Sequence, residues 1–112
     1  MKNDKYIEKG GLRWGESFGS GSNLTWPHAT LSADNRGIVI SYSALFGIMK
    51  NTFSITRDQL KSIKHKKGIL PFSIGVEIDH SNRDCPPYIL FWSFHFEELK
   101  KQLASFGYQV EG

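Results

Sequence analysis

The spacing of apolar side chains changes abruptly after residue 92, and few architectures accommodate both patterns. In the segment 73–79, Ile74, Val76 and Ile78 alternate with polar or small residues, which is typical of a strand with one buried face. In the segment 94–106 the apolar residues are instead separated by three or four positions, which is the spacing of one helical face. The sequence therefore predicts strands followed by a single helix over 94–106, with these residues on its buried face: Phe96, Leu99, Leu103 and Phe106.

Several stretches before this change also have the character of strands. Asp34–Gly37 supplies turn-forming residues between two β-rich segments and predicts a hairpin. The predicted strands cover residues 30–33, 38–43, 51–55, 60–67, 73–79 and 88–92. Consecutive strands at such short spacing favour a mainly β fold, a bent antiparallel meander of six to seven strands. We expect it to form a barrel or sandwich that is capped by the C-terminal helix.

The first 23 residues have a different composition, with glycines and serines that interrupt any periodicity. We interpret residues 1–23 as an N-terminal arm and residues 24–112 as the domain. Leu12, Trp14 and Phe18 are unusual in a pure linker. Two alternatives therefore stay open for the arm: a flexible linker, or a segment that packs on the domain in part as a short strand.

Cysteine content and hydropathy indicate the compartment. Cys85 is the one cysteine among 112 residues, so no internal disulfide can form and no oxidising compartment is needed. The charged start is not followed by an apolar run, and no apolar stretch is long enough to span a bilayer. We expect a soluble, cytoplasmic protein.

Positive charge is concentrated in one segment. The net charge is +3, whereas residues 57–67 alone carry +4, so the rest of the chain sums to −1. Clustered ammonium groups can attract an anionic membrane surface, and the candidate contacts with an anionic partner are Lys61, Lys64, His65, Lys66 and Lys67. The alternative is a solvated strand whose lysines protect an exposed edge from aggregation. The segment lacks the interleaved aromatic residues on which bases stack, which disfavours nucleic acid as a partner.

No residue pattern predicts catalysis, a cofactor or a metal. The four histidines lack the close, repeated spacing of zinc ligands. Asp79 and His80 precede Cys85, but neighbours on a strand point to opposite faces, so they do not form a nucleophile with its base. The aromatic residues at the junction of the last strand and the helix have two interpretations, core beneath the helix or the wall of a pocket: Phe91, Trp92, Phe94 and Phe96.

The order of these elements resembles the pleckstrin-homology superfold, in its small bacterial and GRAM-like forms. The resemblance covers residues 27–110 and is carried by Pro27–Leu31, Gly37–Ile40, Phe53–Ile55, Asp58–Ile63, Gly75–His80, Ile89–Trp92 and Leu103–Val110. It implies a PH-like fold and a general binding role, without a given ligand. In phosphoinositide-binding members the loop between the first two strands carries several basic residues. The segment assigned to that loop here, Asp34–Gly37, holds only Arg36, beside an aspartate.

These observations together predict a non-enzymatic interaction module that binds a protein partner or an anionic surface. Two other classes of function stay open. One is a structural domain that self-assembles through an exposed strand edge, and the other is a small enzyme with an unrecognised site. The sequence leaves the oligomeric state open.

Overall fold

A computed structural model describes residues 4–17, 21–68 and 74–112. The elements in chain order are β1 (Tyr6–Gly15), β2 (Ser22–Asp34), β3 (Gly37–Ala44), β4 (Met49–Thr56), β5 (Leu60–Lys67), β6 (Ile74–His80), β7 (Tyr88–Ser93), α1 (Phe96–Ser105) and β8 (Val110–Glu111). The fold is mainly β with one helix near the C-terminal end, as the change in apolar spacing predicts. Residue 73, the expected start of the strand predicted over 73–79, lies outside the described residues.

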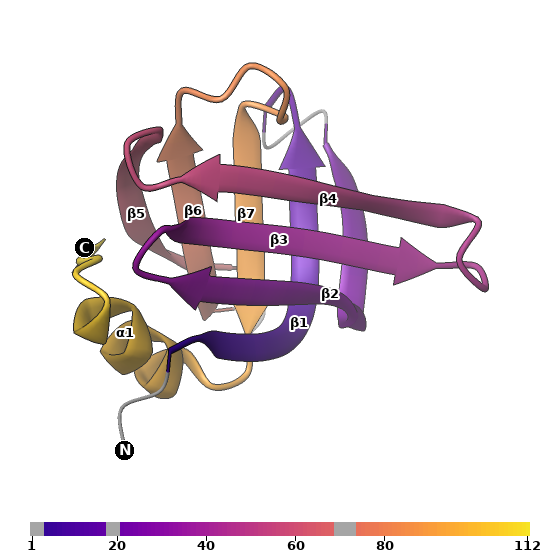
Figure 1. Ribbon diagram of the computed structural model, residues 1–112. Coiled ribbons are helices and arrows are strands. Elements are labelled where there is room, and N and C mark those ends of the chain that lie inside the picture. The colour runs from indigo at the N-terminus through magenta and orange to yellow at the C-terminus, as the bar shows by residue number, and fades with distance from the viewer. Residues whose placement is uncertain (1–3, 18–20, 69–73) are drawn as a thin grey trace.

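The strands form one sheet in the order β4-β3-β2-β1-β7-β6-β5-β8. Neighbouring strands are antiparallel, except that β8 runs parallel to β5. Figure 1 shows the bend of this sheet: β2, β3 and β4 cross in front of β6 and β7, and α1 lies at one corner. The expected barrel is not closed, because β4 and β8 are the two edges of the sheet. The described residues form eight strands where six to seven were predicted. One of the two additions to the six predicted segments is β1, which agrees with the alternative that the arm packs in part as a strand, and the other is the two-residue β8.

Strand β1 arises from the segment interpreted as an arm and connects the two layers. It pairs with β2 along both halves, with a register shift between Gly10 and Leu12, and its second half also pairs with β7. A Cβ at Gly10 would collide with the carbonyl oxygen of Trp92 and the ring of Phe91. Glycine is therefore required for the close approach of the backbones at the bend, and Leu12 is fully buried beyond it. Phe18 lies outside the described residues.

Because β1 is the first strand, the loop between the first two strands lies between β1 and β2 and not at Asp34–Gly37. That loop is residues 16–21, of which 18–20 lie outside the described residues. Asp34–Gly37 instead forms the tight turn between β2 and β3, where Asp34 Oδ1 accepts hydrogen bonds from the amides of Arg36 and Gly37. The assignment of Asp34–Gly37 to the loop between the first two strands is therefore wrong.

Helix α1 docks through the predicted apolar face. Leu99 and Leu103 are fully buried and Phe106 is nearly so, while Phe96 packs partly buried against the same core. The helix ends at Gly107, whose φ of +93° suits glycine. The amide of Gly107 donates to the Ala104 carbonyl oxygen and the amide of Tyr108 to that of Leu103, which makes a Schellman motif.

A buried carboxylate fixes the start of the helix relative to β1. The Tyr6 hydroxyl donates to Glu8 Oε1 at 2.7 Å, and the Ser93 hydroxyl donates to Glu8 Oε2. Ser93 Oγ also accepts a hydrogen bond from the amide of His95, the residue that precedes the helix. Burial, followed by the hydrogen bond to Glu8, raises the pKa of the Tyr6 phenol. These contacts join the first strand to the last turn before the helix.

Within the described residues, no helix has the length and apolar character required to cross a membrane.

Candidate interaction surfaces

The predicted basic segment lies on β5, at the side of the sheet next to β8. Lys61, Lys64, Lys66 and Lys67 are exposed, as a charged contact surface requires. They are not isolated from negative charge, because Lys66 Nζ lies 3.6 Å from Glu77 Oε1 on β6. Lys64 is the register partner of Glu77 on β6 and of Glu111 on β8. Carboxylates therefore flank this strand on both sides, and its contact with an anionic partner stays a prediction.

His65 differs from the lysines around it. Its ring stacks on Phe96 of α1, with centroids 4.4 Å apart and an interplanar angle of 29°. Its Nε2 is buried and has no hydrogen-bond partner among the described residues. His65 therefore takes part in the packing of the helix, whereas the lysine side chains point to solvent.

Cys85, in the loop between β6 and β7, lines the same pocket as His80 at the end of β6, but both ring nitrogens of the histidine have backbone partners. His80 Nε2 lies 2.8 Å from the Pro86 carbonyl oxygen, and Nδ1 accepts a hydrogen bond from the Asn82 amide. The Nε2 nitrogen therefore carries the proton, which leaves no free base for the thiol. Burial raises the pKa of Cys85, which disfavours the reactive thiolate. Asp79 is exposed and His80 is buried, as the alternation along a strand predicts.

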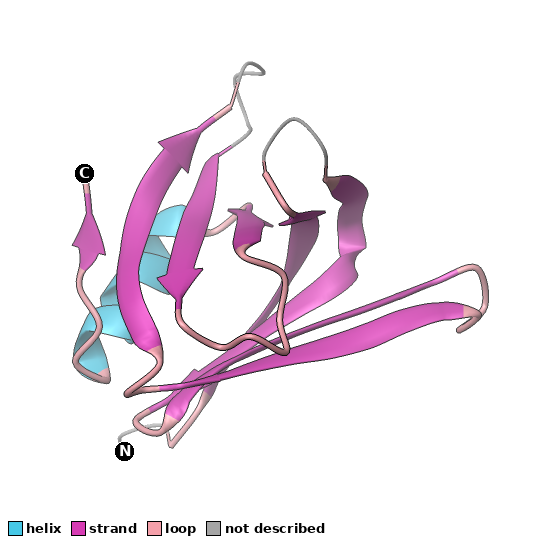
Figure 2. Ribbon diagram, turned by 90° about the horizontal axis from the view of Figure 1, so that it is seen from above, coloured by secondary structure: helices cyan, strands magenta, loops and turns pink. Residues whose placement is uncertain are grey.

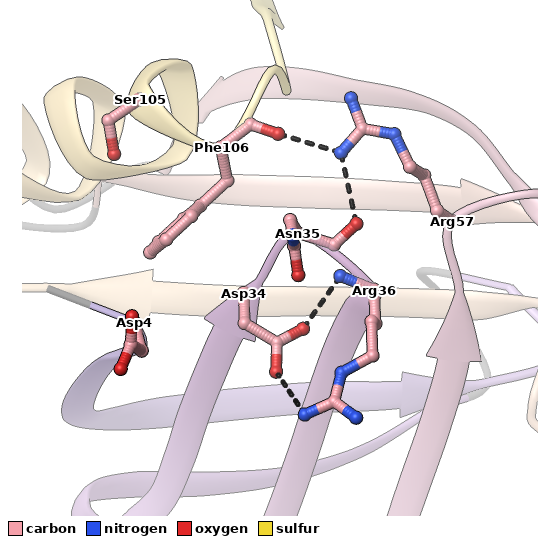
Figure 3. Close-up of a pocket in the computed structure, with 7 residues that line it drawn as sticks. All are labelled: Asp4, Asp34, Asn35, Arg36, Arg57, Ser105 and Phe106. Carbon is pink, nitrogen blue, oxygen red and sulfur yellow. Dashed lines mark hydrogen bonds and ion pairs between the residues drawn. The ribbon is translucent and has the colours of Figure 1, made fainter.

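The largest cavity lies between the β2–β3 turn and the end of α1, and Figure 3 shows the residues that line it. Three of its charged side chains, Asp34, Arg36 and Arg57, bind one another or the backbone. Arg57 Nη1 donates to the carbonyl oxygens of Phe106 at 2.7 Å and Asn35 at 3.2 Å, and Arg36 lies 3.8 Å from Asp34. The Arg57 guanidinium also lies 4.8 Å from the ring centroid of Tyr108. These contacts hold the helix end against the sheet, so this cavity has a structural explanation.

The aromatic residues at the strand–helix junction divide between the core and the surface. Phe91 is fully buried and Phe96 is partly so, beneath the helix as expected. Phe94 is 61% exposed and meets the 53% exposed Trp26 edge to face, with centroids 6.1 Å apart. The core interpretation thus fits Phe91 and Phe96, while Trp26 and Phe94 form an exposed aromatic pair.

The hairpin of β3 and β4 carries a second apolar surface, at its tip. Figures 1 and 2 show this hairpin extending well beyond the body of the protein. Four large apolar side chains are exposed there, and we name them the hairpin tip: Leu45, Phe46, Ile48 and Met49. Phe46 is completely exposed and Ile48 is 84% exposed.

The backbone of the hairpin tip is strained. Leu45 and Phe46 have φ values of 54° and 56°, and the Gly47 amide donates to the Ala44 carbonyl oxygen at 3.1 Å. Two successive residues in the left-handed region make a turn that Asn and Gly normally occupy. Leucine and phenylalanine gain no packing there that offsets the steric cost, so stability does not explain their presence.

A polar groove lies beside this tip, across the outer face of β1 to β4. We name it the outer groove, and it is lined by Lys9, Pro27, His28, Thr30, Ser41, Tyr42, Ser43, Lys50, Asn51 and Thr52. The register places Lys9, Thr30, Ser41 and Thr52 in one row across four strands. Ser43 and Lys50 face each other one step nearer to the tip. None of the lining residues is acidic.

The edge strand β4 is partly blocked by side chains. The Thr52 amide donates to Asn51 Oδ1, and the Thr56 amide donates to Gln59 Oε1. The Ser54 carbonyl oxygen accepts a hydrogen bond from Asn82 Nδ2 at 2.8 Å. Backbone groups that another strand would need already have partners at these positions, which is a known way to prevent edge-to-edge association.

Among the described residues, no group of three His, Cys, Asp or Glu side chains lies close enough to hold a metal ion.

Sequence reasoning missed the hairpin tip and the outer groove. The tip left a signal, because large apolar residues surround Gly47 where a turn is expected, and no Asp or Glu occurs from residue 35 to residue 57. The outer groove left none, because Lys9 lies in the predicted arm and Lys50 beside a turn. The pairing of β1 with β2, together with the register across β3 and β4, is what shows that these lysines share a face.

No protein-family model matches the sequence, and no curated protein matches it. Among solved structures, the fold is similar to the hSac2 domain from human phosphoinositide phosphatase Sac2. The two are 10% identical, with a TM-score of 0.48 over 99% of this chain and 77% of that chain.

Proposed function

We propose that this protein is a non-enzymatic interaction module that binds the surface of an anionic membrane through its β3–β4 hairpin. The observation that carries the proposal is the hairpin tip, where four large apolar side chains are exposed on a strained turn. Contiguous apolar side chains at an exposed position are typical of contact surfaces for membranes or proteins. A projecting tip needs no complementary pocket in a bilayer, whereas a protein partner would have to supply one.

The expected energies are sufficient for reversible binding. Full burial of one such side chain contributes about 1.5–3 kcal/mol, and each lysine near an anionic surface contributes about 1 kcal/mol. The β3–β4 hairpin carries Lys50 beside its tip and no acidic residue between residues 37 and 56. Apolar insertion and charge attraction therefore act on the same element.

Two further parts of the proposal concern family and compartment. A pleckstrin-homology relationship is supported by the antiparallel succession of seven long strands and the single helix that follows them. A cytoplasmic location is consistent with a single cysteine, which requires no oxidising compartment.

The test is sedimentation with phosphatidylcholine vesicles that either contain or lack phosphatidylserine. The wild-type protein should bind the vesicles that contain phosphatidylserine, and Phe46→Ser with Ile48→Ser should lose at least about tenfold in affinity, since two buried side chains are removed. Phe94→Ser is the matched control, because it removes an exposed aromatic side chain from another surface. A wild-type protein that ignores these vesicles at low salt would overturn the proposal.

A second candidate is a protein partner bound at the aromatic pair of Trp26 and Phe94. Aromatic side chains that are exposed in the free protein are enriched at the centres of protein interfaces. This candidate predicts the opposite ranking of the variants, with Phe94→Ser abolishing capture of a partner and the tip variant retaining it. Self-assembly through β4 has less support, since side chains already occupy part of that edge.

A further inference from the structure

The outer groove combines the groups that bind a phosphate ester. Lysine side chains stand at both sides, Lys9 from β1 and Lys50 from β4, and the hydroxyls of Thr30, Ser41 and Thr52 lie between them. Ammonium and hydroxyl groups donate hydrogen bonds to phosphate oxygens, and the ammonium groups add charge. Both lysines are exposed and have no ion-pair partner within the described part of the chain.

His28 adds a donor or acceptor at the same place. Its Nδ1 lies 3.1 Å from the Thr25 carbonyl oxygen, which can only accept a hydrogen bond. Nδ1 therefore carries a proton, and Nε2 is left available to a ligand. The exposed imidazole extends the polar lining on the side of β2.

Absence of negative charge distinguishes this groove from the other positive surface. The lysines of β5 lie beside Glu77 and Glu111, whereas no carboxylate lines the outer groove. An anion that approaches the outer groove therefore meets no repulsion from its lining residues.

The position of the outer groove relative to the hairpin tip selects a lipid over a free phosphate. Lys50 is two residues from Ile48, a distance of about 7 Å along an extended strand. The apolar side of an interfacial amphipathic helix is buried about 5–10 Å into the boundary between headgroups and acyl chains, and we expect a similar depth for the hairpin tip. With the tip inserted to that depth, Lys50 lies at the level of the lipid phosphates.

We propose that the outer groove is the headgroup site of the membrane-bound protein and holds the phosphate of an anionic lipid between Lys9 and Lys50. The site rests on the proposed membrane function, since it requires the hairpin tip to lie in the bilayer. The hydroxyls of Thr30, Ser41 and Thr52 orient the phosphate, and the two ammonium groups select anionic over zwitterionic vesicles.

The test compares two double variants with equal changes in charge. Lys9→Gln with Lys50→Gln should lower affinity for phosphatidylserine-containing vesicles about tenfold or more. Lys100→Gln with Lys101→Gln, on the exposed face of α1, should lower it by less than about threefold, because these charges lie outside the site. Thermal melting should show that both proteins remain folded, since exposed charges contribute little to stability.

Amide NMR shifts with soluble dihexanoyl phosphatidylserine locate the headgroup directly. Shifts should be concentrated at Thr30, Ser41 and Thr52, and inorganic phosphate at the same concentration should produce smaller ones. If the tip variant loses vesicle binding but the two lysine pairs behave alike, the headgroup site is wrong and the membrane function stands. If the wild-type protein binds no vesicles, both proposals fall.

Discussion

Strand β5 and the outer groove both carry exposed lysines, yet the surroundings of these lysines differ. The lysines of β5 are close in sequence, and the fold places Glu77 and Glu111 beside them. The lysines of the outer groove are far apart in sequence, and the fold brings them together without an acidic neighbour. Positive charges that are adjacent in the sequence can therefore be offset by acidic residues from other strands. Positive charges that are far apart in the sequence can be brought to one surface by the fold.

The two regions also differ in their relation to the core. Strand β5 lies against α1, because the ring of His65 stacks on the ring of Phe96. Its side chains thereby contribute to the packing at the corner of the sheet that the helix covers. The hairpin tip contacts nothing comparable and extends away from the body. We expect substitutions at the buried contacts of β5 and α1 to change stability, and substitutions of the exposed side chains of the hairpin tip to change binding.

The largest expected effect is on the helix side of this comparison. Leu103→Ala removes a fully buried side chain between α1 and the sheet, and should lower the free energy of unfolding by about 2–5 kcal/mol. Denaturant titration measures the loss. Vesicle binding by the folded fraction should be unchanged, and a parallel loss of affinity would show that the two regions are not separate.

A smaller effect of opposite sign is expected at the hairpin tip. Replacing Leu45 with Asn and Phe46 with Gly gives the residues that this left-handed turn prefers, and should raise the free energy of unfolding by about 1–2 kcal/mol. Vesicle affinity should fall at the same time, because Leu45 and Phe46 no longer insert. A variant that gains stability and retains full binding would show that the tip does not contact lipid.

The smallest effect is expected on β5 itself. Changing Lys64, Lys66 and Lys67 together to Gln should reduce vesicle affinity by less than about threefold, since Glu77 and Glu111 already offset part of their charge. The melting temperature should remain nearly the same, because the exposed pair of Lys66 and Glu77 contributes little. If this variant lost more vesicle affinity than the variant of Lys9 and Lys50, the binding site would be the basic segment on β5 and not the outer groove.

How much of the fold could be predicted from sequence depended on whether the signal was local. The strands with alternating apolar residues and the helix with its buried face were predicted, because each pattern is complete within one element. Strand β1 was interpreted as an arm because Gly10 and Gly11 interrupt its pattern, although the bend requires glycine. Its place beside β2 and β7 follows from pairings between distant parts of the chain.

The candidate site was predicted less well for the same reason. Lys61 to Lys67 stood out because their charges are adjacent in sequence, but the acidic residues beside them come from β6 and β8. Lys9 and Lys50 were not among the predicted contacts, because neither belongs to a dense cluster of basic residues in the sequence. Strand register, which depends on long-range pairing, decides which of these groups share a face.

The contact between Glu8 and Ser93 has a consequence for how the chain folds. It joins residues 85 positions apart, and β1 pairs with β7 at the same place. The loss of chain entropy on closing so long a loop precedes most of the contacts that reward it, which slows folding in sheets of high contact order. Strand β1 must pair with β7 before the bent sheet can form, so a growing chain can assemble this sheet only after β7 has emerged from the ribosome.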